Sequence, residues 1–527
     1  MGPNMLILAS AAVLLLCGAA NAARILALVP VASRSHHIWN SALTVGLAKK
    51  GHQIWALSPD NLEDNIYPNL TQMVIKGTYE KLREDFTMES FVEDSPFTFL
   101  KTMWAFGINV CRYESSTQAV KDLLKMPRDF FDLIITEVVF GECMFMFLHH
   151  FGGGTRIPVV GITAFGMGPW TDVLTGARTL PSVFAFPILP YVSKMSFTER
   201  LQNTLLTGYH WNNMIREYYP EQQKIAEEAY GEPLPPLIDL ASNISVILVN
   251  NHYVLNGPQA QLPGIIDVGA MQCSPAQRLP KDISSFLNEA KIGAIYFSLG
   301  SNLMSELLPK DKLEVIVATF ASLGPGIRVL WKFDPKVPIG HLPSNVLLKK
   351  WLPQEDVLGH PKTLAFVSHA GLLSTQEAIY HGVPIVAVPF FADQHTNARR
   401  LVELGVAVHV DFLTLTKESF KEKILNVTIN PRYAENMRKM SNLLRDQPET
   451  PLDRAIFWVE FALRQGNDGM KALRSAGFDL AWYQYFLIDV LAAVLIAIVS
   501  PLLLIYVTMK TVMNKLRGNS KSKKKKL

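Results

Sequence analysis

"FVSHAGLLSTQEAIYHGVPIVAVPFFADQHTNA", residues 366–398, contains a strand, a helix and a second strand in direct succession. The first apolar run ends at Ser368, the helical segment carries Glu377, and the second apolar run ends shortly before Asp393. Strands that alternate with helices build parallel sheets covered on both faces. Ligands of such sheets bind at the carboxyl ends of the strands, where these polar residues stand. The stretch therefore predicts an α/β fold with a ligand site.

The same alternation occurs in two separate parts of the chain. Strand candidates in the first part are Arg24–Pro30, Gln53–Ser58, Phe131–Thr136, Ile157–Thr163 and Ser245–Val249. Those in the second part are Ala294–Leu299, Arg328–Lys332, Leu364–Val367 and Pro384–Val388. A chain of 527 residues is too long for one hydrophobic core. We therefore predict two facing, Rossmann-like, doubly wound domains, residues 23–255 and 293–484, joined by a linker at 256–292.

Both ends of the chain have the composition of membrane-targeting segments. Residues 1–22 contain an apolar run that ends in Ala20-Asn21-Ala22, the small-x-small pattern of a cleaved signal peptide. Residues 485–508 form a second apolar run with Asp489 as its one charge, and about 20 apolar residues suffice to cross a bilayer. We predict one transmembrane helix there.

The tail, residues 509–527, carries eight Lys and Arg residues and no acidic residue. A tail of this charge stays cytoplasmic, which predicts a single-pass type I protein with a lumenal body. Lys524-Lys525-Lys526-Leu527 resembles the dilysine address of the endoplasmic reticulum membrane, although anionic lipid alone could attract such lysines. The net charge of the whole chain is +4, so the body is slightly acidic, and we expect no nucleic-acid partner.

Cysteines and glycosylation sites agree with a lumenal body. Outside the signal segment only Cys111, Cys143 and Cys273 occur, so at most one disulfide can form. The sequons begin at Asn69, Asn243 and Asn426 and predict a glycoprotein.

Motifs of the second half resemble the signature of the UDP-glycosyltransferases, in their membrane-anchored animal form. They are Phe297-Ser298-Leu299-Gly300-Ser301, Trp351-Leu352-Pro353-Gln354, His360-Pro361, His369-Ala370-Gly371, Ser374, Glu377, Gly382-Val383-Pro384, Pro389 and Asp393-Gln394. The Leu-Leu-Ser-Thr run at 372–375 is similar to invertebrate members. The resemblance implies a GT-B fold whose second domain, 293–484, binds a UDP-sugar and whose first domain, 23–255, binds the acceptor.

The donor-site residues that the resemblance implies also suit their ligand chemically. An indole can stack on uracil, an amide can bond the ring, and the amino end of a helix attracts a diphosphate. A carboxylate can accept both ribose hydroxyls. The implied donor residues are Ser301, Trp351, Leu352, Gln354, His369, Gly371, Ser374, Glu377, Asp393 and Gln394. Ala370 replaces a glycine common in animal members, and we expect little effect from this change.

The resemblance also implies a general base in the first half. The family has a His followed, sixteen residues on, by the His of a Gly-His pair, which here are His36 and His52. Its usual partner is an Asp at the end of the strand near residue 136, and this chain has Glu137 there. Glu142 could compete for the role. We expect His37 to be structural.

These observations predict an enzyme, an inverting UDP-glycosyltransferase that moves a sugar, expected to be glucose, to a hydroxyl of a small lipophilic acceptor. The aromatic-rich stretch 97–106 could line the acceptor pocket or belong to the core. The chain has no Asp-x-Asp motif, and we expect neither a metal nor a cofactor beyond the UDP-sugar co-substrate. The alternatives are a UDP-glucuronate-using transferase and a non-catalytic, membrane-anchored protein that binds UDP-sugar or lipophiles. We also expect a role in detoxification, and a homo-oligomer stays open.

Overall fold

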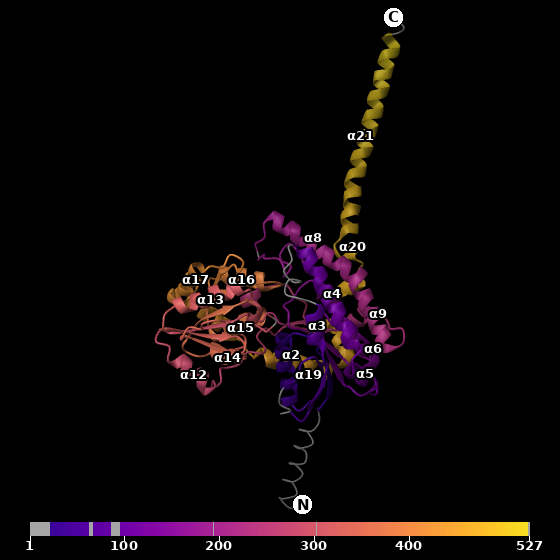
Figure 1. Ribbon diagram of the computed structural model, residues 1–527. Coiled ribbons are helices and arrows are strands. Elements are labelled where there is room, and N and C mark those ends of the chain that lie inside the picture. Colours follow the sequence, from indigo (N-terminus) through magenta and orange to yellow (C-terminus); the bar gives the residue numbers. More distant parts are fainter. Residues whose placement is uncertain (1–21, 63–66, 86–94, 193, 302, 525–527) are drawn as a thin grey trace, which may run out of the picture. The chain divides into compact units, whose positions relative to one another are not determined.

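The computed structural model describes residues 22–62, 67–85, 95–192, 194–301 and 303–524. It divides into a large unit, residues 1–474, and a small unit, residues 475–527. Figure 1 shows that the large unit contains two α/β halves. The signal peptide predicted at 1–22 lies almost wholly outside the described residues.

The first half is built on a parallel sheet of seven strands in the order β3-β2-β1-β4-β5-β6-β7. The strands are β1 (Arg24–Leu28), β2 (Gln53–Ser58), β3 (Leu70–Val74), β4 (Leu133–Glu137), β5 (Val159–Thr163), β6 (Val246–Val249) and β7 (Ile265–Asp267). All neighbours are parallel, and Leu28 at the end of β1 is paired with Thr136 near the end of β4. The strand ends that the sequence predicted as a site therefore lie side by side.

The second half is built on a parallel sheet of six strands in the order β10-β9-β8-β11-β12-β13. The strands are β8 (Gly293–Ser298), β9 (Ile327–Lys332), β10 (Val346–Lys349), β11 (Thr363–Ser368), β12 (Ile385–Ala387) and β13 (Ala407–His409). Ser368 is paired with Ser298 of β8 and with Ala387 of β12. The predicted pair of Rossmann-like, doubly wound sheets is confirmed, and each changes winding direction at a central strand.

Helices cover both faces of the first sheet. The principal ones are α2 (Arg34–Lys49), α3 (Thr78–Asp85), α4 (Pro96–Ser115), α5 (Gln118–Leu124), α6 (Met146–Phe151), α8 (Phe197–Asn213), α9 (Tyr219–Tyr230) and α10 (Leu237–Ala241). Shorter elements are the 3₁₀ turn η2 (Glu142–Phe145), the π-helical turn η3 (Met214–Tyr218), α7 (Asp172–Thr175) and α11 (Tyr253–Asn256).

The helices of the second half are α12 (Lys281–Asn288), α13 (Lys310–Ser322), α14 (Gln354–Leu358), α15 (Leu372–His381), α16 (Gln394–Glu403), α17 (Lys417–Ile429) and α18 (Pro431–Arg445). Alternate strand residues face opposite sides, as β-geometry requires. Tyr296 and Phe366 thus pack toward α15 and α18, whereas Phe297 and Val367 pack toward α13 and α17.

The helix α19 (Pro451–Met470) follows the second sheet in sequence but packs on the first. Ala455, Ile456 and Val459 of α19 share one hydrophobic core with Ile25 of β1 and Trp39 of α2. Strand β7 also joins the first sheet, although it lies in the segment 256–292 that the sequence suggested as a linker. The first half is therefore completed by residues from the far end of the chain.

The two halves touch along α16. The Thr396 hydroxyl lies 2.8 Å from the carbonyl oxygen of Pro187 and 2.6 Å from that of Leu189, and Arg399 Nη1 donates to Pro190 O at 2.5 Å. A second contact joins the Ala270 N–H to Gln376 Oε1 of α15 at 3.2 Å. The carboxyl ends of the strands of both sheets are held near each other by these contacts.

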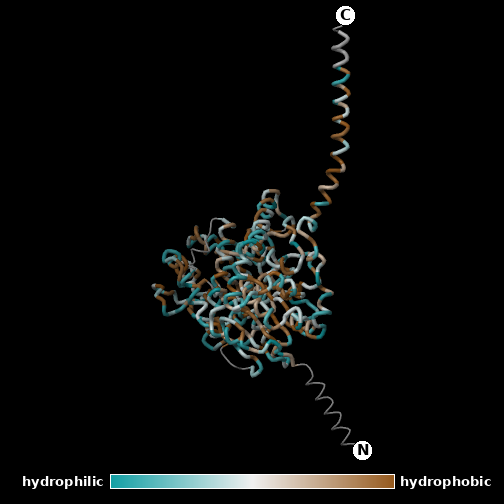
Figure 2. The backbone as a smooth tube through the Cα atoms, turned by 90° about the vertical axis from the view of Figure 1, so that its right-hand side faces the viewer, coloured by the Kyte–Doolittle hydropathy of each residue, from teal (hydrophilic) through white to brown (hydrophobic). Residues whose placement is uncertain are grey.

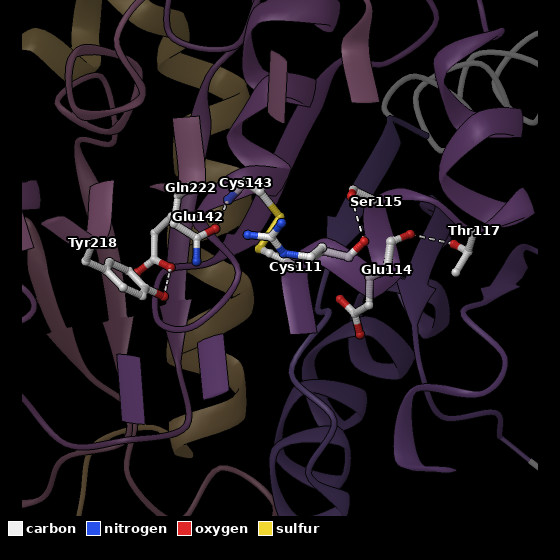
Figure 3. The surroundings of a disulfide bond; sticks show 9 residues. Cys111, Glu114, Ser115, Thr117, Glu142, Cys143, Tyr218 and Gln222 are labelled. Atoms are coloured by element: carbon white, nitrogen blue, oxygen red, sulfur yellow. Dashed lines mark hydrogen bonds between the residues drawn. A yellow bond between two sulfur atoms is a disulfide. The ribbon is translucent and has the colours of Figure 1, made fainter. Parts of the chain in front are cut away.

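One disulfide, Cys111–Cys143, ties α4 to η2, and Cys273 is unpaired. Figure 3 shows Glu142, Tyr218 and Gln222 gathered at the Cys143 end of the bond, and the neighbours of Cys111 on α4 at the other end. Because η2 follows β4 within five residues, the bridge fixes the chain just beyond Glu137.

The small unit contains α20 (Trp482–Tyr485) and the long helix α21 (Ile488–Lys524). Its segment Ile488–Arg517 is 30 residues long and apolar enough to cross a membrane, in agreement with the span predicted at 485–508. Figure 2 shows the hydrophobic colouring along the first part of α21, giving way to hydrophilic residues toward the carboxyl end.

Candidate active site

The predicted base and its predicted partner meet in the first half. His36 lies in the first turn of α2, directly after β1, and Glu137 is the last residue of the neighbouring β4. His36 Nδ1 lies 2.5 Å from Glu137 Oε1, and Asn40 Nδ2 donates to Glu137 Oε2 at 3.4 Å. Both His36 and Glu137 are buried. With Nδ1 directed at the carboxylate, Nε2 is the nitrogen that can accept a proton.

Glu142, the alternative partner, has a different neighbour. Its Oε2 accepts a hydrogen bond from the Tyr218 hydroxyl at 2.7 Å. Burial is the main cause that raises the pKa of Glu142 to about 7, and the charge of Glu137 adds to the shift. The structure therefore pairs Glu137 with His36, and Glu142 with Tyr218.

The other two histidines named by the sequence have contacts that hold the fold. His37 lies 3.3 Å from Ser58 Oγ through Nδ1 and 3.3 Å from Ser41 Oγ through Nε2, and burial lowers its pKa. His52 Nδ1 accepts from the N–H of Ala23 at 3.2 Å, just before β1. In the described part of the chain, the hydrogen bonds of these two rings go to residues other than His36 and Glu137.

In the second half, His369 lies between two glycines at the carboxyl ends of β8 and β11. A Cβ at Gly300, which has a φ of +91°, would lie 2.7 Å from the His369 ring, and one at Gly371 would lie 2.4 Å from it. Burial, helped by the charge of Lys332, lowers the pKa of His369 to about 4. Its buried Nδ1 has no hydrogen-bond partner among the described residues. The ring is thus neutral near pH 7.

Gly371, which packs against the His369 ring, is the N-cap of α15. The free N–H groups of the first turn of α15 therefore lie close to His369. Gln354, the first residue of α14, donates through Nε2 to two residues of α15, Ser374 Oγ at 3.0 Å and Glu377 Oε2 at 2.5 Å. Burial is the main cause that raises the pKa of Glu377 to about 8. Three predicted donor residues therefore form one hydrogen-bonded group.

The predicted sugar-binding residues lie at the start of α16. Gln394 Oε1 accepts from the N–H groups of Phe390 and Phe391, so its amide nitrogen is the group left for a ligand. Asp393 Oδ2 accepts from Asn397 Nδ2 at 2.7 Å. Burial raises the pKa of Asp393, and the charge of His36 in the other half opposes that shift.

Ser301, Trp351 and Leu352 complete the predicted donor set. The indole of Trp351 is 54 % exposed, whereas Leu352 is buried beside it. The Ser301 hydroxyl accepts a hydrogen bond from Lys332 Nζ at 3.2 Å. The predicted donor residues thus lie in the loops that follow the strands of the second sheet or in the helices α14, α15 and α16.

Lys332 was not predicted from the sequence. It ends β9, donates also to Gly300 O at 2.9 Å, and places Nζ 4.7 Å from the centre of the Trp351 ring. Burial is the main cause that lowers its pKa to about 8. Lys332 lies outside the motifs that imply the other donor residues, although it also is a polar side chain at a strand end.

Three non-glycine residues near this site have a left-handed backbone. They are Phe140 (φ 66°), Ala370 (φ 62°) and Ala392 (φ 55°), which follow β4, β11 and β12. A side chain in this region costs about 1–2 kcal/mol relative to glycine. The change from Gly to Ala at 370 therefore carries a backbone strain that the sequence did not reveal.

Among the described residues, no group of three or more His, Cys, Asp or Glu side chains could hold a metal ion. The positive groups that could meet a diphosphate in this part of the structure are Lys332 and the N–H groups that open α15.

Solved structures with a similar fold define the class. Glycosyltransferase VinC, in complex with DTDP, aligns with a TM-score of 0.58 at 19% identity and covers 84% of this chain and all of its own. TcCGT1, in complex with UDP, aligns with a TM-score of 0.55 at 15% identity over the same shares. The fold is that of the GT-B glycosyltransferases.

The family follows from the sequence comparisons. The model of the family described as "UDP-glucoronosyl and UDP-glucosyl transferase" matches residues 27–526. UDP-glucosyltransferase 2 of Dactylopius coccus is 31% identical over 528 residues, covering 99% of both chains. UDP-glucuronosyltransferase 2A3 of Cavia porcellus is 32% identical over 524 residues, covering 94% of this chain and 95% of its own. The chain belongs to this family and is a UDP-sugar glycosyltransferase.

Proposed function

We propose that this enzyme transfers glucose from UDP-glucose to a hydroxyl of a small lipophilic acceptor, with inversion at the anomeric carbon. The observation that carries the proposal is the buried His36–Glu137 pair at the end of the first sheet. The hydrogen bonds that join α16 to the first half support a site shared by this base and the proposed sugar-binding residues at the start of α16, Asp393 and Gln394.

In this reaction the acceptor O–H gives its proton to His36 Nε2 while the oxygen attacks the anomeric carbon. The bond from that carbon to the UDP oxygen breaks, and UDP leaves with the electron pair. Glu137 stabilises the imidazolium as it forms and holds the ring in the required tautomer. The N–H groups that open α15, with His369 and Ser374, meet the negative charge on the leaving diphosphate.

Trp351 supplies a flat, exposed ring on which uracil can stack, and the backbone at Leu352 lies beside it. Gln354 is held by the Tyr296 hydroxyl at 3.0 Å, which orients its amide near Ser374 and Glu377. Glu377 then accepts the ribose hydroxyls, and Asp393 and Gln394 bind the hydroxyls of the transferred sugar.

An aromatic cluster beside His36, made of Phe106, Phe140 and Phe165, supports a lipophilic acceptor. The Phe165 ring meets the His36 ring edge-on, with 4.7 Å between centroids. Phe140 lies 5.9 Å from Phe165 and 5.7 Å from Phe106, and all three phenylalanines are partly exposed. Within the aromatic stretch 97–106, Phe106 belongs to this aromatic cluster. Trp104 is instead buried and stacks on Tyr209 in the core.

Glucose is favoured over glucuronate by the invertebrate-like run at 372–375 and by the relative from Dactylopius coccus that is named a glucosyltransferase. Relatives named glucuronosyltransferases make UDP-glucuronate the second candidate. The test gives purified enzyme both donors at equal concentration with a panel of phenols and alcohols, and identifies products by mass. Glucosides should dominate in the wild type and be lost in His36→Ala. Dominant glucuronides would contradict the proposed donor.

The apolar helix supports a type I location in the endoplasmic reticulum membrane, with the body lumenal and the tail cytoplasmic. Protease added to sealed microsomes should then remove the tail and leave the body intact. Digestion of the body would contradict this orientation.

A further inference from the structure

Arg34 is a cation of the acceptor half that reaches the donor half. It is the first residue of α2, two positions before His36, so one helix end carries both side chains. Its guanidinium carbon lies 5.7 Å from the centre of the Trp351 ring, which belongs to the second half. No donor-site assignment from the sequence included Arg34.

A buried carboxylate fixes the direction of this guanidinium. Arg34 Nη1 donates to Asp60 Oδ1 at 2.7 Å, and Asp60 is 3% exposed at its side chain. The Tyr79 hydroxyl occupies the other oxygen, Oδ2, at 2.5 Å. Because a guanidinium has five N–H donors, the bond to Asp60 leaves several of them for another partner. The side chain is 37% exposed, so those donors are open to a ligand.

Lys332 approaches the same indole from the donor half. Its Nζ lies 4.7 Å from the centre of the Trp351 ring and is bonded to Gly300 O and Ser301 Oγ. No carboxylate lies within 4.0 Å of Lys332 among the described residues. The indole therefore has two cations beside it, one from each half, and an anion bound between them would relieve their repulsion.

We propose that Arg34 is a donor-binding residue supplied by the acceptor half, which contacts the diphosphate of the UDP-sugar together with Lys332. This inference rests on the proposed donor site at Trp351. When nucleotide is bound, Arg34 then adds a further contact between the two halves, and this contact comes from the same helix end that carries His36. A uridine without phosphate would gain little from Arg34.

The experiment measures the dissociation constants of UDP and of uridine by calorimetry on full-length enzyme in detergent. Arg34→Ala should weaken UDP binding by about tenfold or more, as expected for a lost charge-assisted hydrogen bond, and leave uridine binding within about twofold. Asp60→Asn, which releases the guanidinium, should weaken UDP binding by less. The matched control is Arg24→Ala, since Arg24 also pairs with an aspartate, Asp132 at 3.3 Å, but at the start of β1.

Arg34→Gln keeps most of the side chain and serves if Arg34→Ala does not fold. Equal UDP affinity in the wild type and in the folded Arg34 variant overturns the inference while the donor site stands. An equal loss of uridine and UDP affinity also overturns it, because Arg34 would then support the fold of the site. If the wild type binds neither compound, the proposed donor site fails, and the inference fails with it.

Discussion

The two halves each place a histidine directly after a central strand, and the surroundings of the two rings are opposite. His36 follows β1 and meets the carboxylate of Glu137 on the neighbouring strand. His369 follows β11 and packs against two glycines, and burial, with the charge of Lys332 adding to the effect, lowers its pKa to about 4. The carboxylate at His36 Nδ1 fixes the tautomer that leaves Nε2 able to accept a proton, whereas His369 has no carboxylate partner among the described residues and stays neutral. The same side chain therefore suits proton acceptance in one sheet and neutral hydrogen bonding in the other.

The strongest test of this contrast removes the ring at His36. A positioned base contributes about 100- to 10,000-fold to the rate, so His36→Ala should lower kcat by that factor for hydroxyl acceptors. UDP should still bind, because the proposed nucleotide contacts come mainly from the second half. Steady-state kinetics and calorimetry measure the two effects. His37→Ala is the control. Near-normal turnover by His36→Ala would contradict the assignment of His36 as the proton acceptor.

A smaller loss of kcat is expected when His36 is kept and the carboxylate of its partner Glu137 is neutralised. Glu137→Gln should lower kcat less than His36→Ala does, since the base remains but its imidazolium is no longer stabilised. Glu142→Gln should leave kcat close to that of the wild type, because the amide can keep the Tyr218 contact. A crippled Glu142→Gln enzyme beside a normal Glu137→Gln enzyme would reverse the assigned partner.

On the donor side, Trp351→Ala should raise the donor KM and leave the acceptor KM unchanged. Stacking and burial of a large ring contribute about 1–3 kcal/mol. Initial rates at varied UDP-sugar concentration measure the change, and Trp351→Phe should restore part of the affinity. An unchanged donor KM in folded Trp351→Ala would place the uracil elsewhere.

The smallest expected effect is the dependence of UDP affinity on pH. The protonated form of Lys332 attracts a diphosphate, and its pKa is about 8, so UDP affinity should fall as pH rises from 7 to 9, by up to about tenfold. Lys332→Arg should flatten this fall, because arginine stays charged in that range. Glu377, whose pKa is also about 8, remains in the variant, so an identical fall in Lys332→Arg would assign the pH dependence to Glu377.

Most residues of the candidate donor site could be named from the sequence because they are close together in the chain. Residues 351–394 contain two strand ends and three helix starts, so a single motif names most of the candidate site. Lys332 was not predicted as a site residue because, in the sequence, it looks like the last residue of an ordinary strand. Nothing in the local sequence shows that Gly300, in the loop after the neighbouring strand β8, lies beside it.

The acceptor side was less predictable because its partners are distant in sequence. Glu137 and His36 are 101 positions apart, and both Glu137 and Glu142 follow the same strand. Only the pairing of β1 with β4 decides between the two carboxylates. The aromatic stretch 97–106 had a helical pattern that could not show which ring leaves the core.

The return of α19 onto the first sheet sets an order for synthesis. Strands β1 to β7 are synthesised before the second half. The sheet face on which α2 packs also needs α19 to cover it, so part of this face stays exposed until residues 451–470 have been synthesised. Folding of the first half is therefore completed only after the second half has been made. A chain that stops at residue 450 exposes Ile25 and its neighbours, whereas one that stops at residue 474 keeps that core closed. Premature termination anywhere before α19 thus yields a protein with an exposed apolar sheet.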